Sequence, residues 1–204
     1  MRPKSYSYTF VALSANGYLS TTEGTGAGPW TTFLGQPGDG CSHPVTINSA
    51  ANLAAITFTV TGTDAEGRTI SEAITGPNAT TVTSSKYFAT LTSIAASATV
   101  GANTFQVGWT ALARTPIYPV NTYGTVGPIL AVDIGGTVTY SGMATNGDVF
   151  TIASDTLFFD PITGMSSVTA DASVAPAAGC TGLRIHVASH TSGTLAVTYS
   201  QGRG

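Results

Sequence analysis

The residues of this chain whose side chains can bind a metal or carry out catalysis are few and widely spaced. His186 and His190 stand four residues apart, with Cys180 shortly before them, while Cys41 and His43 lie much earlier in the chain. Histidines four residues apart share a face on a helix but not on a strand, and none of these spacings matches a structural zinc pattern. We therefore predict no metal site. His186 is expected to face solvent on a strand, and His190 to lie in a turn.

The acidic residues are dispersed in the same way. They occur singly among turn-forming residues, as Asp64, Glu66, Asp133, Asp148, Asp155, Asp160 and Asp171. Two carboxylates that met in space could form a glycosidase pair, but the sequence brings no two together, and Asp favours turns because it bonds to nearby backbone. No serine lies in a G-x-S-x-G elbow, and the Gly-rich segment 24–29 precedes no helix. We expect neither an enzyme nor a bound cofactor.

The composition excludes further classes of function. The 204 residues carry a net charge of −3 with only seven Lys and Arg, which leaves little to neutralise the phosphates of a nucleic acid. No apolar run approaches the ~20 residues of a membrane helix, and the apolar patch 8–13 is too short for a signal peptide. Cys41 and Cys180 could form one disulfide, but two isolated cysteines define no disulfide framework. A soluble, unexported protein without nucleic-acid or membrane partners is expected.

The secondary structure that carries these side chains is predicted to be β-strands, and the clearest strands lie in residues 54–94. Ile56, Phe58 and Val60 alternate with threonines, as in a half-buried strand. Segments 68–74 and 87–94 supply two more runs, which predicts a three-stranded antiparallel meander. Its core face is expected to be Ile56, Phe58 and Val60, packed with Val107 and Trp109 from a neighbouring strand.

Other short strands follow from alternation and turn signals. A first strand is predicted at 5–13, followed by a turn at Ala15-Asn16-Gly17, and Gly135-Gly136 and Thr191-Ser192-Gly193 are predicted as hairpin turns. Further strands are expected at 45–47, 104–109, 129–134, 137–141, 149–152, 157–159, 183–187 and 195–199. No window favours a helix.

Residues 110–128 contain three prolines and two glycines with no periodicity, which is typical of a boundary between domains. The predicted organisation is an N-terminal β domain with an extended arm or loop (1–110), a linker (111–128) and a C-terminal β domain (129–204). The fold class is all-β, with two tandem small antiparallel β-sandwich or jelly-roll-like units.

Several segments resemble structural proteins of tailed-bacteriophage virions. ITFTVTGTDAEGRTISEAITGPNATTVTSSKYFATLTSI (56–94) is similar to a segment widespread in those proteins, and VTINSAAN (45–52) resembles its usual leading flank. LAVDIGGTVTYS (130–141) and LRIHVASHTSGTLAVTYSQG (183–202) resemble later strands and the terminus of the family. The resemblance covers about residues 7–20 and 44–202. The Gly/Trp-rich loop 23–40 and residues 141–178 depart from the pattern.

The resemblance implies a non-enzymatic virion protein, assembled in the cytoplasm of the host bacterium, that acts through contacts with its own copies and with capsid or neck/tail proteins. A capsid decoration (cement) role and a homo-oligomer are expected, with a head–tail junction or tail component as the alternative. Interface anchors are expected at Trp30, Phe33, Tyr118 and Tyr123, because aromatic residues are enriched at interfaces.

Two other classes of function remain open at this stage. Trp30, Trp109, Tyr118 and Tyr123 could instead form a sugar-stacking platform in a carbohydrate-binding module or adhesin. A glycan depolymerase would need two specific acids.

Overall fold

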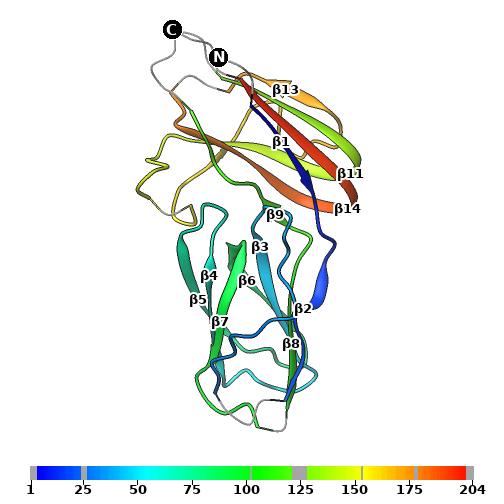
Figure 1. Cartoon of the computed structure of the whole chain (residues 1–204), viewed down its shortest axis with the longest axis vertical. Helices are drawn as coiled ribbons and strands as arrows, with labels where there is room; N and C mark the ends of the chain where they lie inside the picture. The colour runs from blue at the N-terminus through cyan, green and yellow to red at the C-terminus, as the bar shows by residue number, and fades with distance from the viewer. Residues whose placement is uncertain are drawn as a thin grey trace. The chain divides into compact units, whose positions relative to one another are not determined.

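The computed structural model describes residues 4–23, 27–101, 103–120, 128–152, 154–176 and 179–200 (Figure 1). Within these ranges all regular structure is β, as the sequence predicts, and no helix occurs. The chain divides into two compact units that interleave along the sequence. Unit 1 comprises residues 1–12, 39–41 and 111–204, and unit 2 comprises residues 13–38 and 42–110.

Unit 2 is a sandwich of two antiparallel sheets. Its strands are β2 (Ser14–Glu23), β3 (His43–Asn48), β4 (Thr57–Thr63), β5 (Thr69–Thr75), β6 (Thr81–Phe88), β7 (Thr90–Ala96) and β8 (Thr104–Trp109). One sheet has the order β2-β8-β3-β6 and the other the order β5-β4-β7. The rings of Phe58 in β4 and Phe105 in β8 lie 5.1 Å apart, so the core fills the space between the two sheets.

The side chains expected to form this core lie on both sheets. Phe58, Val60 and Val107 are fully buried, and Trp109 is nearly so. Val107 and Trp109 come from the opposite sheet rather than from a strand bonded to β4. Ile56 differs from the expectation: it precedes β4 and is only half-buried, and its amide donates to the carbonyl of Leu53 in the turn before the strand.

The predicted meander is wrong, because the third strand lies elsewhere. β4 and β5 do form an antiparallel hairpin, but β7 pairs with β4 on its other side. The segment expected as one strand, 87–94, divides between the two sheets: β6 ends at Phe88 and pairs with β3, whereas β7 begins at Thr90. Ala89 forms the corner, and its amide donates to the carbonyl of Thr63.

The turn expected at Ala15-Asn16-Gly17 is also wrong, because these residues lie within β2. The pairing of β2 with β8 is irregular between Ser14 and Leu19, which leaves extra residues on β2. The ring of Trp109 packs directly on Gly17, where any Cβ would clash with it. The glycine here makes room for a tryptophan and does not reverse the chain.

Unit 1 is a seven-stranded antiparallel sheet built on two very long strands. Its strands are β1 (Lys4–Thr9), β9 (Ala113–Arg114), β10 (Tyr118–Pro119), β11 (Ile129–Thr145), β12 (Asp160–Pro161), β13 (Ala172–Val174) and β14 (Gly182–Ser200). Figure 1 shows β11 and β14 running side by side, with β1 next to β14. β9 and β10 pair with β14, and β12 and β13 pair with β11.

The two hairpins predicted in this half are wrong for a shared reason. Gly135-Gly136 lies inside β11 and Thr191-Ser192-Gly193 inside β14, and the two stretches face each other in the ladder, Gly136 opposite Gly193. Both glycines have positive φ, and a Cβ on Gly193 would clash with the backbone oxygen of Gly135. The glycines therefore permit a local distortion of a paired ribbon, which sequence alone does not distinguish from two turns.

The N-terminal strand and the expected linker both belong to unit 1. β1 pairs with the C-terminal part of β14, from Lys4 opposite Tyr199 to Thr9 opposite Thr194. Within the region expected as a linker, β9 and β10 pair with the first part of β14. The sequence-based division assigns these strands wrongly, because alternation identifies a strand but not the partner to which it binds.

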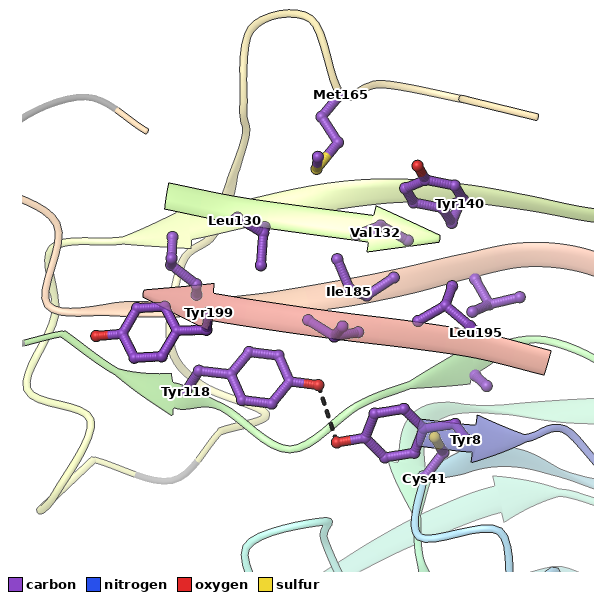
Figure 2. Packing of buried hydrophobic residues seen from close by; sticks show 14 of the residues in the cluster. Tyr8, Cys41, Tyr118, Leu130, Val132, Tyr140, Met165, Ile185, Leu195 and Tyr199 are labelled. Carbon is purple, nitrogen blue, oxygen red and sulfur yellow. Dashed lines mark hydrogen bonds between the residues drawn. The ribbon is translucent and has the colours of Figure 1, made fainter. Parts of the chain in front are cut away.

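The core of unit 1 collects the inward-facing residues of these strands (Figure 2). Leu130 and Val132 come from one end of β11 and Tyr140 from the other, and Ile185 and Leu195 come from the two halves of β14. All five are fully buried. Both ends of each long strand thus contribute to one continuous core.

Candidate contact surfaces

The loop 27–38 of unit 2 is attached to the sandwich at several points. The Trp30 amide donates to the carbonyl of Ile94 at 2.8 Å, and the Ile94 amide donates to the carbonyl of Trp30 at 3.0 Å. The side chain of Gln36 bonds to both the amide and the carbonyl of Leu91. The described part of this segment is therefore a packed loop and not the extended arm expected from its Gly-rich sequence.

The aromatic side chains of this loop face inward in part. Trp30 is half-buried and meets the ring of Phe105 edge-on at 5.2 Å. Phe33 is half-buried against Tyr18, with ring centroids 6.0 Å apart. Leu34, by contrast, is 68 % exposed. The apolar surface that this loop offers to a partner is therefore centred on Leu34, which sequence reasoning missed because it considered only the aromatic residues.

Tyr118 lies in the core of unit 1, 3 % exposed, and is not a surface contact residue as expected. Its hydroxyl donates to the hydroxyl of Tyr8 at 2.8 Å, and Figure 2 shows the two rings end to end. Burial raises the pKa of Tyr8 to about 12 and also raises the pKa of Tyr118, so both hydroxyls stay protonated at neutral pH. Tyr123 lies outside the described residues.

These positions also bear on the sugar-platform interpretation. Trp30 and Trp109 pack in unit 2, on Phe105 and Tyr18 respectively, and Tyr118 is buried in unit 1. A stacking platform needs exposed ring faces. Of the rings proposed for it, Trp109 and Tyr118 are buried and Trp30 is half-buried against Phe105.

His190 is buried, which corrects its expected place in a turn. Its Nδ1 lies 2.9 Å from the carbonyl oxygen of Ala111, and its Nε2 lies 2.8 Å from that of Val11. The ladder between β14 and β11 skips Ala188 and Thr191, so two bulges reset the alternation and turn His190 to the same face as Val187 and Leu195. Its ring serves as a structural tie between two backbone segments.

His186 is half-buried rather than solvent-facing. Burial, together with the neighbouring charges of Arg114 and Arg184, lowers its pKa to about 4. Cys41 and Cys180 are free, buried thiols, and burial raises the pKa of both, so neither is a ready nucleophile. Among the described residues, no group of three or more His, Cys, Asp or Glu side chains could hold a metal ion.

Several of the dispersed acids order local backbone. Asp64 is buried and accepts from the amides of Glu66 and Arg68. Asp171 accepts from the amide of Ile134, and Asp148 accepts from two amides in the turn that follows it. The hydrogen bonds of Asp64 and Asp148 order their own turns, as expected of Asp, whereas Asp171 bonds to a backbone segment that is distant in the sequence.

Residues 146–152 and 154–160 form a loop between β11 and β12 that displays the most exposed large apolar side chains. Phe150 is 74 % exposed and Phe158 is 78 % exposed, and Ile152 is also exposed. Sequence analysis predicted strands at 149–152 and 157–159 and missed this surface. The alternation there is real, with Val149, Leu157 and Phe159 buried, but it belongs to a folded loop.

Comparisons with known proteins give no family for the chain. No protein-family model matches the sequence, and the search of curated proteins found no significant match. The described residues contain no helix that is long and apolar enough to cross a membrane.

Proposed function

We propose that this protein is a non-enzymatic structural component of a tailed-phage particle that acts through contacts between its β units and neighbouring protein chains. Capsid decoration is the favoured position, and the head–tail junction or the tail is the alternative. The sequence resemblance and the exposed side chains of Leu34, Phe150 and Phe158 both support this role.

The observation that carries the proposal is the exposure of large apolar side chains on ordered loops. Leu34, Phe150 and Phe158 are each more than two-thirds exposed, at 68 %, 74 % and 78 %. The loops that bear them are held by their own hydrogen bonds, through Gln36 in unit 2 and Asp148 in unit 1. Large apolar side chains held on ordered loops are of the kind that anchor protein interfaces.

The composition supports the same conclusion. Only 8 % of the residues are charged, so repulsion between like charges gives the chain little protection against association. A shell or tail of repeated subunits makes use of this property, because symmetry-related neighbours cover the same surface on every copy.

The test is mass spectrometry of particles purified from the phage whose genome encodes this chain. The proposal expects the protein in the particles at a fixed ratio to the major capsid protein. A large copy number would favour decoration of the shell, and a small one the neck or tail. Absence of the protein from intact, infectious particles would reject the structural role.

A further inference from the structure

The loop 146–160 combines two exposed phenylalanines with a well-anchored base. Val149, Leu157 and Phe159 point inward and pack with Ile117 in a small core of their own. Phe150 and Phe158 are the chain neighbours of these buried residues and point outward. The two exposed rings are therefore held at fixed points of the fold.

The turn that carries Phe150 is ordered by Asp148. The Asp148 carboxylate accepts from the amides of Phe150 and Thr151 at 2.9 and 3.3 Å and from the Thr151 hydroxyl at 2.6 Å. The Ile152 amide donates to the Asp148 carbonyl at 3.1 Å, which closes one helical turn. A preformed turn loses little conformational entropy when a partner covers it.

The second half of the loop is anchored by Arg184. Its guanidinium carbon lies 3.7 Å above the ring centroid of Phe159, and Arg184 is itself buried. This cation–π contact places Phe159 inward and leaves the preceding Phe158 outward. Both exposed rings thus lie on ordered backbone, as the anchor residues of protein interfaces do.

The charge around the loop indicates the kind of partner. Between residues 115 and 183 the chain has five aspartates and neither lysine nor arginine, and the Arg184 that packs on Phe159 is buried. Asp148 and Asp160, at the two ends of the loop, are both exposed. In a symmetric contact between two copies these carboxylates would come together, and juxtaposed like charges oppose association. The surface is complementary instead to an apolar pocket bordered by lysine or arginine.

We propose that the loop 146–160 is a docking surface on which Phe150 and Phe158 insert into an apolar pocket with a basic rim on a different protein. We take that protein to be a component of the phage particle, and in this respect the inference rests on the proposed function. The aspartates steer and orient the contact, and the two rings provide the buried area.

Photo-crosslinking tests the proposal without assuming the partner. The chain is produced during infection with benzoylphenylalanine in place of Phe158, or in place of Ile129 as a control, an exposed apolar residue of unit 1 outside the loop. Infected cells and purified particles are irradiated, and the crosslinked peptides are sequenced. We expect position 158 to capture a non-identical protein at an apolar site flanked by Lys or Arg, and position 129 to capture it far less. A crosslink only to another copy, or none, overturns the proposal.

Rebinding separates this inference from the proposed function. Purified protein is added to particles that lack it, and the bound fraction is measured by sedimentation. Phe150→Ser with Phe158→Ser is expected to weaken binding about a hundredfold, Ile129→Thr to leave it unchanged, and Asp160→Asn to reduce its sensitivity to salt. Equal binding by wild type and the double variant overturns the docking surface. Absence of the wild-type chain from native particles, together with a basic-pocket crosslink in cells, would reject the virion role and keep the docking surface.

Discussion

At the scale of single residues, two histidines in β14 have opposite surroundings. His190 has a carbonyl oxygen at each ring nitrogen, at 2.9 and 2.8 Å, whereas His186 lies near Arg114 and Arg184. Both ring nitrogens of His190 therefore contact backbone, and the ring joins two segments of unit 1. The arginines beside His186 oppose a positive charge on its ring.

Replacement of His190 by alanine should destabilise the protein, because two backbone carbonyls lose their hydrogen-bonding contact with the ring. A cost of about 2–4 kcal/mol is expected from the loss of two largely buried hydrogen bonds. Urea unfolding of His190→Ala measures it, with Ser189→Ala at the exposed neighbouring position as control. A change within about 0.5 kcal/mol, the range of ordinary surface substitutions, would show that the ring does not hold these segments.

His186 gives a pH dependence of defined sign. Its pKa is lowered to about 4 in the folded protein, from the ordinary 6.5, so between these values the unfolded chain binds more protons. The stabilising contribution is therefore complete above about pH 6.5 and is lost as the pH falls through 4. Relative to His186→Gln, the wild type should lose less than the roughly 3–4 kcal/mol to which the full shift corresponds, because solvent screens this partly exposed ring. Denaturant unfolding at each pH measures this loss. An NMR titration that gives His186 an ordinary imidazole pKa would contradict the prediction.

At the scale of elements, the sequence predicts strands well and predicts their ends and partners poorly. The alternations predicted at 56–61, 68–74 and 104–109 correspond to β4, β5 and β8. Three of the failures share one feature: the turns expected at residues 15–17, 135–136 and 191–193 all rest on a glycine that lies inside a strand. Gly17 accommodates the ring of Trp109, and Gly136 and Gly193 lie opposite each other inside a long ribbon. Glycine occurs where a side chain does not fit, and such positions are found inside strands as well as in turns.

Replacement of Gly193 by alanine tests the distorted ribbon. Gly193 has φ 127°, and an added Cβ would meet the backbone oxygen of Gly135. The strained backbone alone should cost about 1–3 kcal/mol, and the clash adds to this. Gly101→Ala is the matched control, because Gly101 has positive φ but open space around its Cα. If the two variants melted at the same temperature, the close approach of β11 and β14 would be ruled out.

At the scale of the whole molecule, each unit is built from separate stretches of the chain. Residues 1–12 and 39–41 fold with residues 111–204, and β1 occupies the edge of β14. The sequence contained the sign of a boundary near residue 110 but no sign of this interleaving, which depends on pairing between residues nearly two hundred positions apart. The sequence also does not predict that Phe150 and Phe158 are exposed, because their exposure depends on the packing of the adjacent residues Val149, Leu157 and Phe159.

Truncation distinguishes the two organisations. A chain of residues 129–204 lacks β1, β9 and β10 and should not fold, because β14 loses all the strands on one of its sides. A chain of residues 13–110 retains every strand of unit 2 and should give a cooperative unfolding transition. A folded, monomeric fragment 129–204 would restore the simple tandem arrangement predicted from the sequence.

We propose that this protein works by packing against other protein chains in a phage particle, with the loop that carries Phe150 and Phe158 at one such contact. The most direct measurement is a cryo-electron microscopy reconstruction of the intact particle from the phage that encodes it. The account predicts density for both β units at a repeated position, with Phe150 and Phe158 covered by a different protein whose nearby surface carries Lys or Arg. A reconstruction in which every chain is assigned and this one is absent, or is present with both rings open to solvent, would contradict it.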